Sequence, residues 1–288
     1  MGSIAHFRQA MLDASHYQKL NDYYEAHGGT KPPFDPALKA LLAARTQALK
    51  VWWESNTRDE IHRALDLAGE FGTTAVIVGG REAAKVADRL KSAKVPVVLQ
   101  LNFPEEPRVP TEQEYRKKAA AERDEPLRLL ADRKAKWKEQ VATAAALAKA
   151  GVSFAFATEG MERIDSLPAV VRQLIAAGLA TDDALAGLTK NAAAIAGVDS
   201  RLGTLEPGKL GHLIAMTAPF SEERARVKYV LIDGLKFEIK PEDRARTKSR
   251  AGGGPDGLAS AGEPGDRPRI GGRGGVGRGI NPDDEDDP

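Results

Sequence analysis

The sequence predicts an α/β fold built on parallel strands. Short apolar runs recur between residues 50 and 157, and a helical pattern separates each run from the next. The runs are continuous rather than alternating, which is typical of parallel strands covered on both faces. After residue 200 the helical patterns stop, and turn residues separate two further apolar runs. Parallel β/α units followed by a few antiparallel strands are therefore expected.

Two helices are predicted before the first strand. The first spans residues 3–26. Its apolar stripe is made by Ile4, Phe7, Met11, Leu12, Leu20, Tyr23 and Tyr24, which recur at helical spacing. A Gly- and Pro-rich break follows, and Asp35 before Pro36 marks the start of a second helix that continues to about residue 49.

Four parallel strands are predicted, at about residues 50–54, 74–78, 97–101 and 153–157. Thr57 and Glu60 follow the first strand with the spacing of a capping box, which predicts that a helix begins there. The other helices are expected at residues 79–94, 128–151, 167–178 and 181–197. A polar insert between residues 104 and 126 separates the third strand from the long helix.

The last part of the chain is predicted to form strands and then a tail. Residues 212–219 and 227–239 are strand candidates, and Asp233–Gly234 folds the second one into a hairpin. Residues 241–288 are rich in Gly, Pro and charge, so they bury too little apolar surface to offset the entropy of ordering. We expect domains at 1–200 and 201–240, and a disordered tail at 241–288.

Composition and charge exclude several classes of protein. The chain is 42% hydrophobic and 29% charged, as in soluble globular proteins, and its net charge of +1 gives no field that would attract nucleic acid or an anionic membrane. With no cysteine it has neither disulfides nor thiolate metal sites. No apolar run reaches 18 residues, and the first residues do not form a signal peptide. A cytoplasmic location is the default, with the compartment left open.

Two further patterns argue against nucleic acid and against a histidine metal site. The Arg-Gly segment at 269–279 would suit weak binding of single strands, but the acidic residues at 283–287 oppose it. None of the five histidines is paired at the spacings of metal ligands, so each is expected to be structural or solvated. These are His6, His16, His27, His62 and His212.

Strand ends supply the first candidate site residues. Glu159 follows the fourth strand, where it could act as a general base or weak ligand, or stabilise the N-terminus of the next helix. Gly79 and Gly80 could hold an anion or simply form a tight turn. The segment after the third strand is a candidate pocket loop, lined by Asn102 and Phe103.

Residues 178–216 carry a resemblance to a known family. The segment GLATDDALAGLTKNAAAIAGVDSRLGTLEPGKLGHLIAM resembles the C-terminal signature of the amidohydrolase superfamily, in its imidazolonepropionase-like branch. The matching positions are Ala184, Leu185, Thr189, Asn191, Ala192, Gly203, Gly208 and Lys209. Gly211–His212 stands where the family has Ala-Asp, and the resemblance extends over about residues 2–238.

The resemblance implies a fold and an activity. The fold would be the C-terminal half of a (β/α)₈ TIM-type barrel, followed by a few strands of a small β-sandwich. The activity would be metal-dependent hydrolysis of carbon–nitrogen bonds other than peptide bonds, of the cyclic amide type, in a small-molecule substrate. In such sites one or two divalent ions, zinc among them, activate water at the C-terminal ends of the strands.

The family's metal-ligand positions carry other residues here. The histidine position after the first strand falls on Glu54 or Asn56, the second strand ends in glycines, and Glu159 replaces the family's aspartate. The resemblance thus predicts Glu54 and Glu159 as catalytic residues, and Asn56, Asn102 and Phe103 as substrate-binding residues, with no metal ligand. Carboxylates without imidazole make a poor zinc site.

Two interpretations follow. The chain is either a hydrolase of this family, with its competence weakened by the lost ligands, or a non-catalytic barrel fragment that serves as a binding or assembly subunit. Because four strands are half of a closed barrel, the other half is expected from upstream sequence, from another chain or from a homo-oligomer. A half-barrel alone is expected to leave inward side chains partly uncovered, namely Val51, Val76, Ile77, Val97, Leu99, Phe154 and Phe156.

Overall fold

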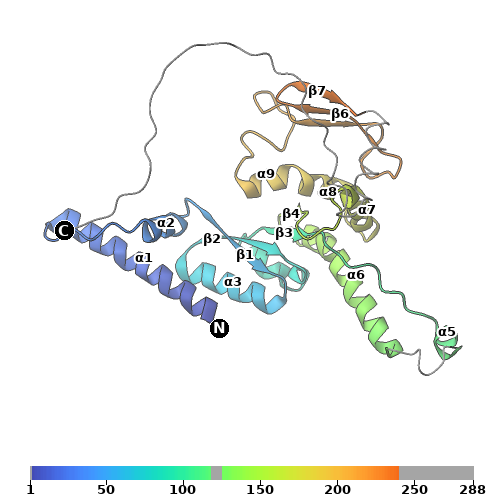
Figure 1. The fold of residues 1–288 in the computed structure, drawn as a ribbon, viewed down its shortest axis with the longest axis horizontal. Helices are drawn as coiled ribbons and strands as arrows, with labels where there is room; N and C mark the ends of the chain where they lie inside the picture. Colours follow the sequence, from blue (N-terminus) through green and yellow to red (C-terminus); the bar gives the residue numbers. More distant parts are fainter. Residues whose placement is uncertain (1, 118–124, 240–288) are drawn as a thin grey trace, which may run out of the picture. The chain divides into compact units, whose positions relative to one another are not determined.

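The computed structural model describes residues 2–117 and 125–239. Residues before 240 belong to one compact unit, which Figure 1 shows as a ribbon. The predicted disordered tail at 241–288 lies outside the described residues. The boundary expected at residue 200 stays a prediction.

The described strands form two separate sheets. In chain order they are β1 (Lys50–Ser55), β2 (Thr74–Gly79), β3 (Val97–Gln100), β4 (Phe154–Ala157), β5 (Leu213–Met216), β6 (Val227–Ile232) and β7 (Leu235–Glu238). The first sheet has the order β1-β2-β3-β4 and all its pairs are parallel, which confirms the predicted parallel α/β arrangement. The second is antiparallel, with the order β5-β6-β7.

Helices precede, connect and follow the parallel strands. The described α-helices are α1 (Gly2–His27), α2 (Pro36–Arg45), α3 (Arg58–Phe71), α4 (Ala87–Ser92), α5 (Glu112–Lys117), α6 (Leu127–Ala150), α7 (Leu167–Ala176), α8 (Thr181–Leu188) and α9 (Lys190–Ala196). Two 3₁₀ turns, η1 (Ala83–Val86) and η3 (Ile164–Ser166), precede α4 and α7.

The capping box predicted before α3 is confirmed. The Thr57 side chain accepts the backbone N–H of Glu60, and the Glu60 carboxylate accepts the backbone N–H of Thr57 in return. The hairpin turn between β6 and β7 is also confirmed. Asp233 has φ of 50° and Gly234 has φ of 82°, the positive values that a tight two-residue turn of matching twist requires.

Three helix predictions were wrong in extent. The segment 79–94 forms only η1 and α4, and the segment 181–197 divides at Thr189, whose φ and ψ of −128° and −93° are not helical. The second helix ends at Arg45 rather than near residue 49, because Gln47 takes a φ of 60°. Hydrophobic periodicity continues through each break, so the sequence pattern alone did not reveal it.

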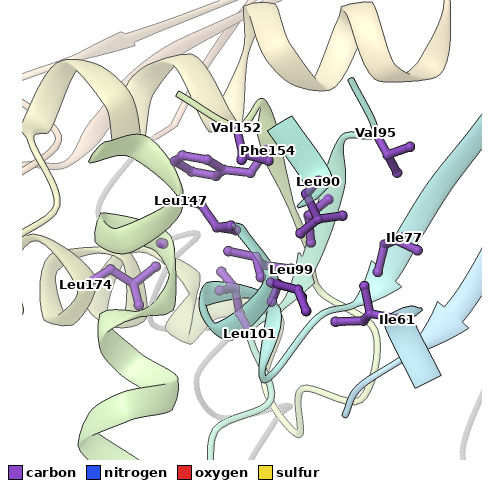
Figure 2. Packing of buried hydrophobic residues seen from close by; sticks show 14 of the residues in the cluster. Ile61, Ile77, Leu90, Val95, Leu99, Leu101, Leu147, Val152, Phe154 and Leu174 are labelled. Carbon is purple, nitrogen blue, oxygen red and sulfur yellow. The ribbon is translucent and has the colours of Figure 1, made fainter. Parts of the chain in front are cut away.

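The larger hydrophobic core lies on one face of the parallel sheet. It joins side chains of the strands to those of α3, α4, α6 and α7. Figure 2 shows this packing. Its labelled members are Ile61, Ile77, Leu90, Val95, Leu99, Leu101, Leu147, Val152, Phe154 and Leu174.

A smaller core lies on the opposite face of the same sheet. Val76, Val98 and Ala155, from the three strands β2 to β4, pack there against Ile195 of α9. The side chain of Lys50 also reaches the C-terminal end of α9, where its ammonium donates to the carbonyl oxygens of Ala194 and Ile195 at 3.0 and 2.8 Å. Helix α9 therefore lies on the face of the parallel sheet opposite the larger core, which is called its inner face below.

The expectation that strand side chains stay uncovered was wrong for most of the named positions. Ile77 and Val97 are 0% exposed, and Leu99 and Phe154 are 5% and 2% exposed, all within the larger core. The reason is the two-residue alternation of a strand, which directs these residues to the helices and not to the inner face. Val76 does point to the inner face, where it is 0% exposed within the smaller core to which α9 contributes Ile195.

The stripe predicted on α1 is only partly buried. Met11 is buried, as is Ala14, which the prediction did not include, and Phe7 packs edge-on against Trp53, with 4.9 Å between the ring centroids. Leu12 and Tyr23 are 56% and 63% exposed, contrary to the prediction. Helix α1 has 26 residues whereas its neighbour α2 has 10. The apolar stripe of α1 therefore extends beyond the length that α2 can cover.

Candidate functional site

The candidate site is the edge at which the four parallel strands end. In the observed register Ser55 pairs with Gly79, Gly79 with Leu99, and Gln100 with Ala157. Residues that follow these strands therefore emerge along one edge, where sites of parallel α/β proteins lie. Four of the five predicted site residues, Glu54, Asn56, Asn102 and Glu159, lie at or next to this edge.

At the end of β1, Asn56 is fixed by its neighbours. Its backbone N–H donates to the carboxylate of Glu60 at 2.8 Å, and its side-chain Oδ1 is buried without a hydrogen-bond partner. Gly79, with φ of 96°, makes room for this amide, since a Cβ there would lie 2.5 Å from Oδ1. Glu54, two residues earlier, is exposed.

Three polar side chains lie at the ends of β3 and β4. Gln100 donates from its amide nitrogen to Oε2 of Glu159 at 3.1 Å, and the Glu159 side chain is exposed. Asn102 packs over Gly160, where a Cβ would come within 2.6 Å of the Asn102 amide nitrogen. Glu159 and Asn102 are thus brought to the same corner of the sheet.

Phe103 lies elsewhere. Its ring packs against the larger core and lines a cavity of about 10 Å³, roughly the space one water molecule needs, between the sheet and α6. Gly80, Leu101 and Thr143 line the same cavity, and Asn102 does not. The segment after Phe103 is fixed by Trp137, whose indole N–H donates to the carbonyl of Pro104 at 2.9 Å.

The two predicted catalytic carboxylates come from opposite edge strands. Glu54 belongs to β1 and Glu159 follows β4, with β2 and β3 between them. At about 4.8 Å per strand, three steps separate the two positions by roughly 14 Å. That separation is too large for one proton or one metal ion to be shared between the two carboxylates.

Two other carboxylates have a lowered pKa beside the site. Hydrogen bonds from the backbone N–H groups of Thr57 and Asn56 lower the pKa of Glu60. A hydrogen bond from Lys85, and then one from the backbone N–H of Arg58, lower the pKa of Glu82. Both carboxylates therefore act as anionic anchors for the loops that follow β1 and β2.

The donor set does not fit the zinc centre that the family resemblance implies. In residues 2–117 and 125–239, no group of three or more His, Asp or Glu side chains is placed to hold a metal ion. At the strand ends the oxygen donors are single carboxylates and amides, whereas zinc without thiolates prefers imidazole.

Sequence reasoning did not identify Gln100 as a site residue. Its signal was a polar side chain at the end of an otherwise apolar strand, on the same face as the inward-pointing Val98. The close contact of Asn102 with Gly160 had no such signal, because it depends on how two separate strands end together.

Across the described part of the chain, no helix is both long and apolar enough to span a membrane.

Solved structures share this fold. An amidohydrolase from Thermotoga maritima MSB8 is 23% identical, with a TM-score of 0.67 over 83% of this chain and 56% of that one. A prolidase complexed with N-methylphosphonate-L-proline is 20% identical, with a TM-score of 0.48 over 74% of this chain and 52% of that one. The chain thus spans little more than half the length of either structure.

A comparison with protein families gives the assignment. No curated protein matches the chain. Residues 48–236, from β1 into β7, match the amidohydrolase family. That match covers the parallel sheet, its strand-end edge and the second sheet up to the first residues of β7. The chain belongs to the amidohydrolase family.

Proposed function

We propose that this chain is part of a hydrolase of non-peptide carbon–nitrogen bonds, of the imidazolonepropionase-like branch, with a small cyclic amide as substrate. Family membership supports hydrolysis as the reaction class. The observation that carries the proposal is the hydrogen bond from Gln100 to Glu159 at the C-terminal edge of the parallel sheet. It presents an exposed, oriented carboxylate where barrel enzymes place their chemistry.

In this proposal Glu159 is the general acid–base. Its carboxylate takes a proton from the water that attacks the amide carbon, and then returns a proton to the departing nitrogen as the carbon–nitrogen bond breaks. Gln100 holds one carboxylate oxygen, which leaves the other free for the proton. Asn102, at the same corner, presents amide groups that can hydrogen-bond the substrate.

A complete barrel is part of the proposal. The parallel sheet of four strands has β1 and β4 at its edges, and the chain covers 56% of the Thermotoga amidohydrolase. We infer that a second barrel half, from further sequence, another chain or a second copy, pairs with these edges. It would complete the walls of the substrate site.

Two observations favour a second candidate function. The described residues hold no cluster of His, Asp and Glu that fits a metal, and Glu54 and Glu159 lie on opposite edge strands. A non-catalytic binding or assembly subunit would need neither a metal nor paired carboxylates. In that case the fold is retained for its surfaces alone.

Metal content and turnover distinguish the two candidates. The purified full chain, alone and with any second half that copurifies, is assayed for zinc by elemental analysis and for hydrolysis of a panel of cyclic amides. Turnover that Glu159→Gln abolishes supports the hydrolase, whether or not zinc is present. The absence of turnover from a preparation that binds a cyclic amide by calorimetry supports the binding subunit and overturns the hydrolase.

A further inference from the structure

The outer strand of the second sheet has an unpaired edge within the described residues. Strand β7 pairs only with β6, with Ile232 opposite Leu235 and Val230 opposite Phe237. In a two-residue hairpin these pairs exchange the main-chain hydrogen bonds. The N–H and C=O groups of the alternate residues, Lys236 and Glu238, therefore point away from β6.

The exposure of β7 makes this edge available. All four of its residues are exposed, and the apolar ones, Leu235 and Phe237, are 66% and 48% exposed. Ile214 and Ile232 continue the same apolar face across the sheet, at 65% and 48% exposed. An exposed edge of this kind is a template for pairing with another strand.

The sequence of β7 is complementary to itself. Consider two antiparallel copies related by a twofold axis at Phe237. Phe237 then faces its own equivalent, Lys236 faces Glu238 of the second copy, and Leu235 faces Ile239 of the second copy. Opposite charges meet on one face and apolar side chains meet on the other, which is the favourable arrangement for cross-strand pairs.

The main chain fits the same register. The outward N–H and C=O groups belong to Lys236 and Glu238, and these two residues are opposite each other across the twofold axis. Each such pair exchanges two hydrogen bonds, so the two equivalent pairs supply about four between the chains. In a register shifted by one residue, the main-chain N–H and C=O groups opposite those of the second copy would be ones that point towards β6. Lys236 would also no longer face Glu238 of the second copy.

Lys236 is already held in place on its own chain. Its ammonium lies 3.9 Å from the ring centroid of Tyr229, the β6 residue opposite Glu238. A cation over an aromatic ring is attracted by it, so the lysine loses less side-chain freedom on pairing. The carboxylate of Glu238 on a second copy would meet this positioned charge.

We propose that β7 is a self-association surface, through which two copies of this chain pair antiparallel about Phe237 into one six-stranded sheet. The inference does not rest on the proposed catalytic function. A second copy that closed the barrel would use β1 and β4, and changes on β7 would leave that association intact.

The first test uses charge. Lys236→Glu gives a β7 with two acidic side chains, and Glu238→Lys gives one with two basic side chains. We expect the dimer dissociation constant of each to rise about tenfold in sedimentation measurements on the full chain, since two cross-strand pairs become repulsive. A 1:1 mixture of the two variants should regain dimerisation. Lys19→Glu, on the exposed surface of α1, is the matched control and should change nothing.

The second test uses position. The chain has no cysteine, so Phe237→Cys introduces a single thiol at the twofold axis. Residues directly opposite in a non-hydrogen-bonded pair have Cα atoms about 4.5 Å apart, which suits a disulfide. Mild oxidation should link Phe237→Cys chains into dimers. Ile214→Cys lies on β5 and is more exposed, at 65% against 48% for Phe237, but it should not be linked.

Three results would overturn the proposal. The first is a full chain that stays monomeric at about 100 μM, since such an edge would then be guarded by its lysine rather than paired. The second is a mixture of the two charge variants that associates no better than either alone. The third is oxidation that links Ile214→Cys as fast as Phe237→Cys. Circular dichroism of each variant confirms that it is folded before it is compared.

Discussion

At the scale of single residues, the proposed mechanism uses one carboxylate rather than a pair. Glu159 has a hydrogen-bonding partner at the sheet edge, whereas Glu54 lies on the far edge strand. If the protein hydrolyses a cyclic amide, Glu159→Gln should lower kcat about 10²- to 10⁴-fold, the usual contribution of general acid–base catalysis. Glu54→Gln is the isosteric control and should change kcat less than about threefold, as a solvated carboxylate with no step to perform.

The kinetic readout also separates catalysis from positioning. Gln100→Leu removes the hydrogen bond to Glu159 and leaves the carboxylate in place. It should reduce kcat less than Glu159→Gln and shift the pH profile of kcat, because the orientation and surroundings of the carboxylate change. Equal and small effects of Glu159→Gln and Glu54→Gln on a verified activity would end the proposed role of Glu159.

The anchoring carboxylate of Glu60 predicts a pH dependence of stability. Because backbone N–H groups lower its pKa from 4.5, its stabilising contribution is complete above that ordinary value and is lost as the pH falls through the lowered one. The difference in unfolding free energy between the native chain and Glu60→Gln should therefore be largest at neutral pH and shrink towards pH 3. Urea unfolding at several pH values measures it, and a pH-independent difference would contradict the capping role.

The same capping box can be tested from its other side. Thr57→Ala removes the acceptor of the Glu60 N–H at the start of α3. We expect a loss of about 1 kcal/mol in the free energy of unfolding, the typical cost of losing an N-cap. Thr57→Ser retains the hydroxyl oxygen and serves as the control, with an expected change of a few tenths of that value.

At the scale of elements, two glycines in helices should respond in opposite directions to the same change. A Cβ on Gly187 of α8 would lie 2.9 Å from the ring of Phe156 and 3.1 Å from that of Phe154, and the Phe154 ring is buried in the larger core. A Cβ on Gly69 of α3 would meet nothing within 4 Å. At Gly187, packing against β4 rather than helix propensity should decide whether the substitution raises or lowers the free energy of unfolding.

The expected magnitudes are large enough to measure. Gly69→Ala should stabilise the chain by up to about 1 kcal/mol, the gain in helix propensity. At Gly187→Ala the same gain is outweighed by overpacking of about 1–3 kcal/mol, so the free energy of unfolding should fall. Chemical denaturation of both variants tests this, and stabilisation by Gly187→Ala would show that α8 is not fixed against β4 as described.

Local chemistry was easier to predict than pairing between distant elements. The capping box at Thr57 and the turn at Asp233–Gly234 could be predicted because each depends on neighbouring residues alone. The break at Thr189 could not, since periodicity continues through it. The corner formed by Gln100 and Glu159 depends on β3 and β4 ending in register, which no local pattern encodes.

At the scale of the whole molecule, the division near residue 240 predicts what truncation does. Residues before 240 form one compact unit that includes both sheets. A chain ending at Ile239 should keep the urea midpoint and the slope of the full chain, because both cores are retained. A loss of more than about 1 kcal/mol would show that residues 240–288 contribute contacts to that unit.

The packing of α9 on the inner face of the parallel sheet has a consequence during translation of the chain. Val76 and Ile195 belong to the same buried cluster but are about 120 residues apart, so at about 5–20 residues per second the ribosome makes the second roughly 6–24 s after the first. During that interval β2 and β3 present Val76 and Val98 to solvent or to a chaperone. Lys50, still farther from its partners in α9, remains free for longer. A nascent chain that stalls before residue 190 would thus carry an open apolar sheet, and should be a substrate for holdase chaperones and degradation.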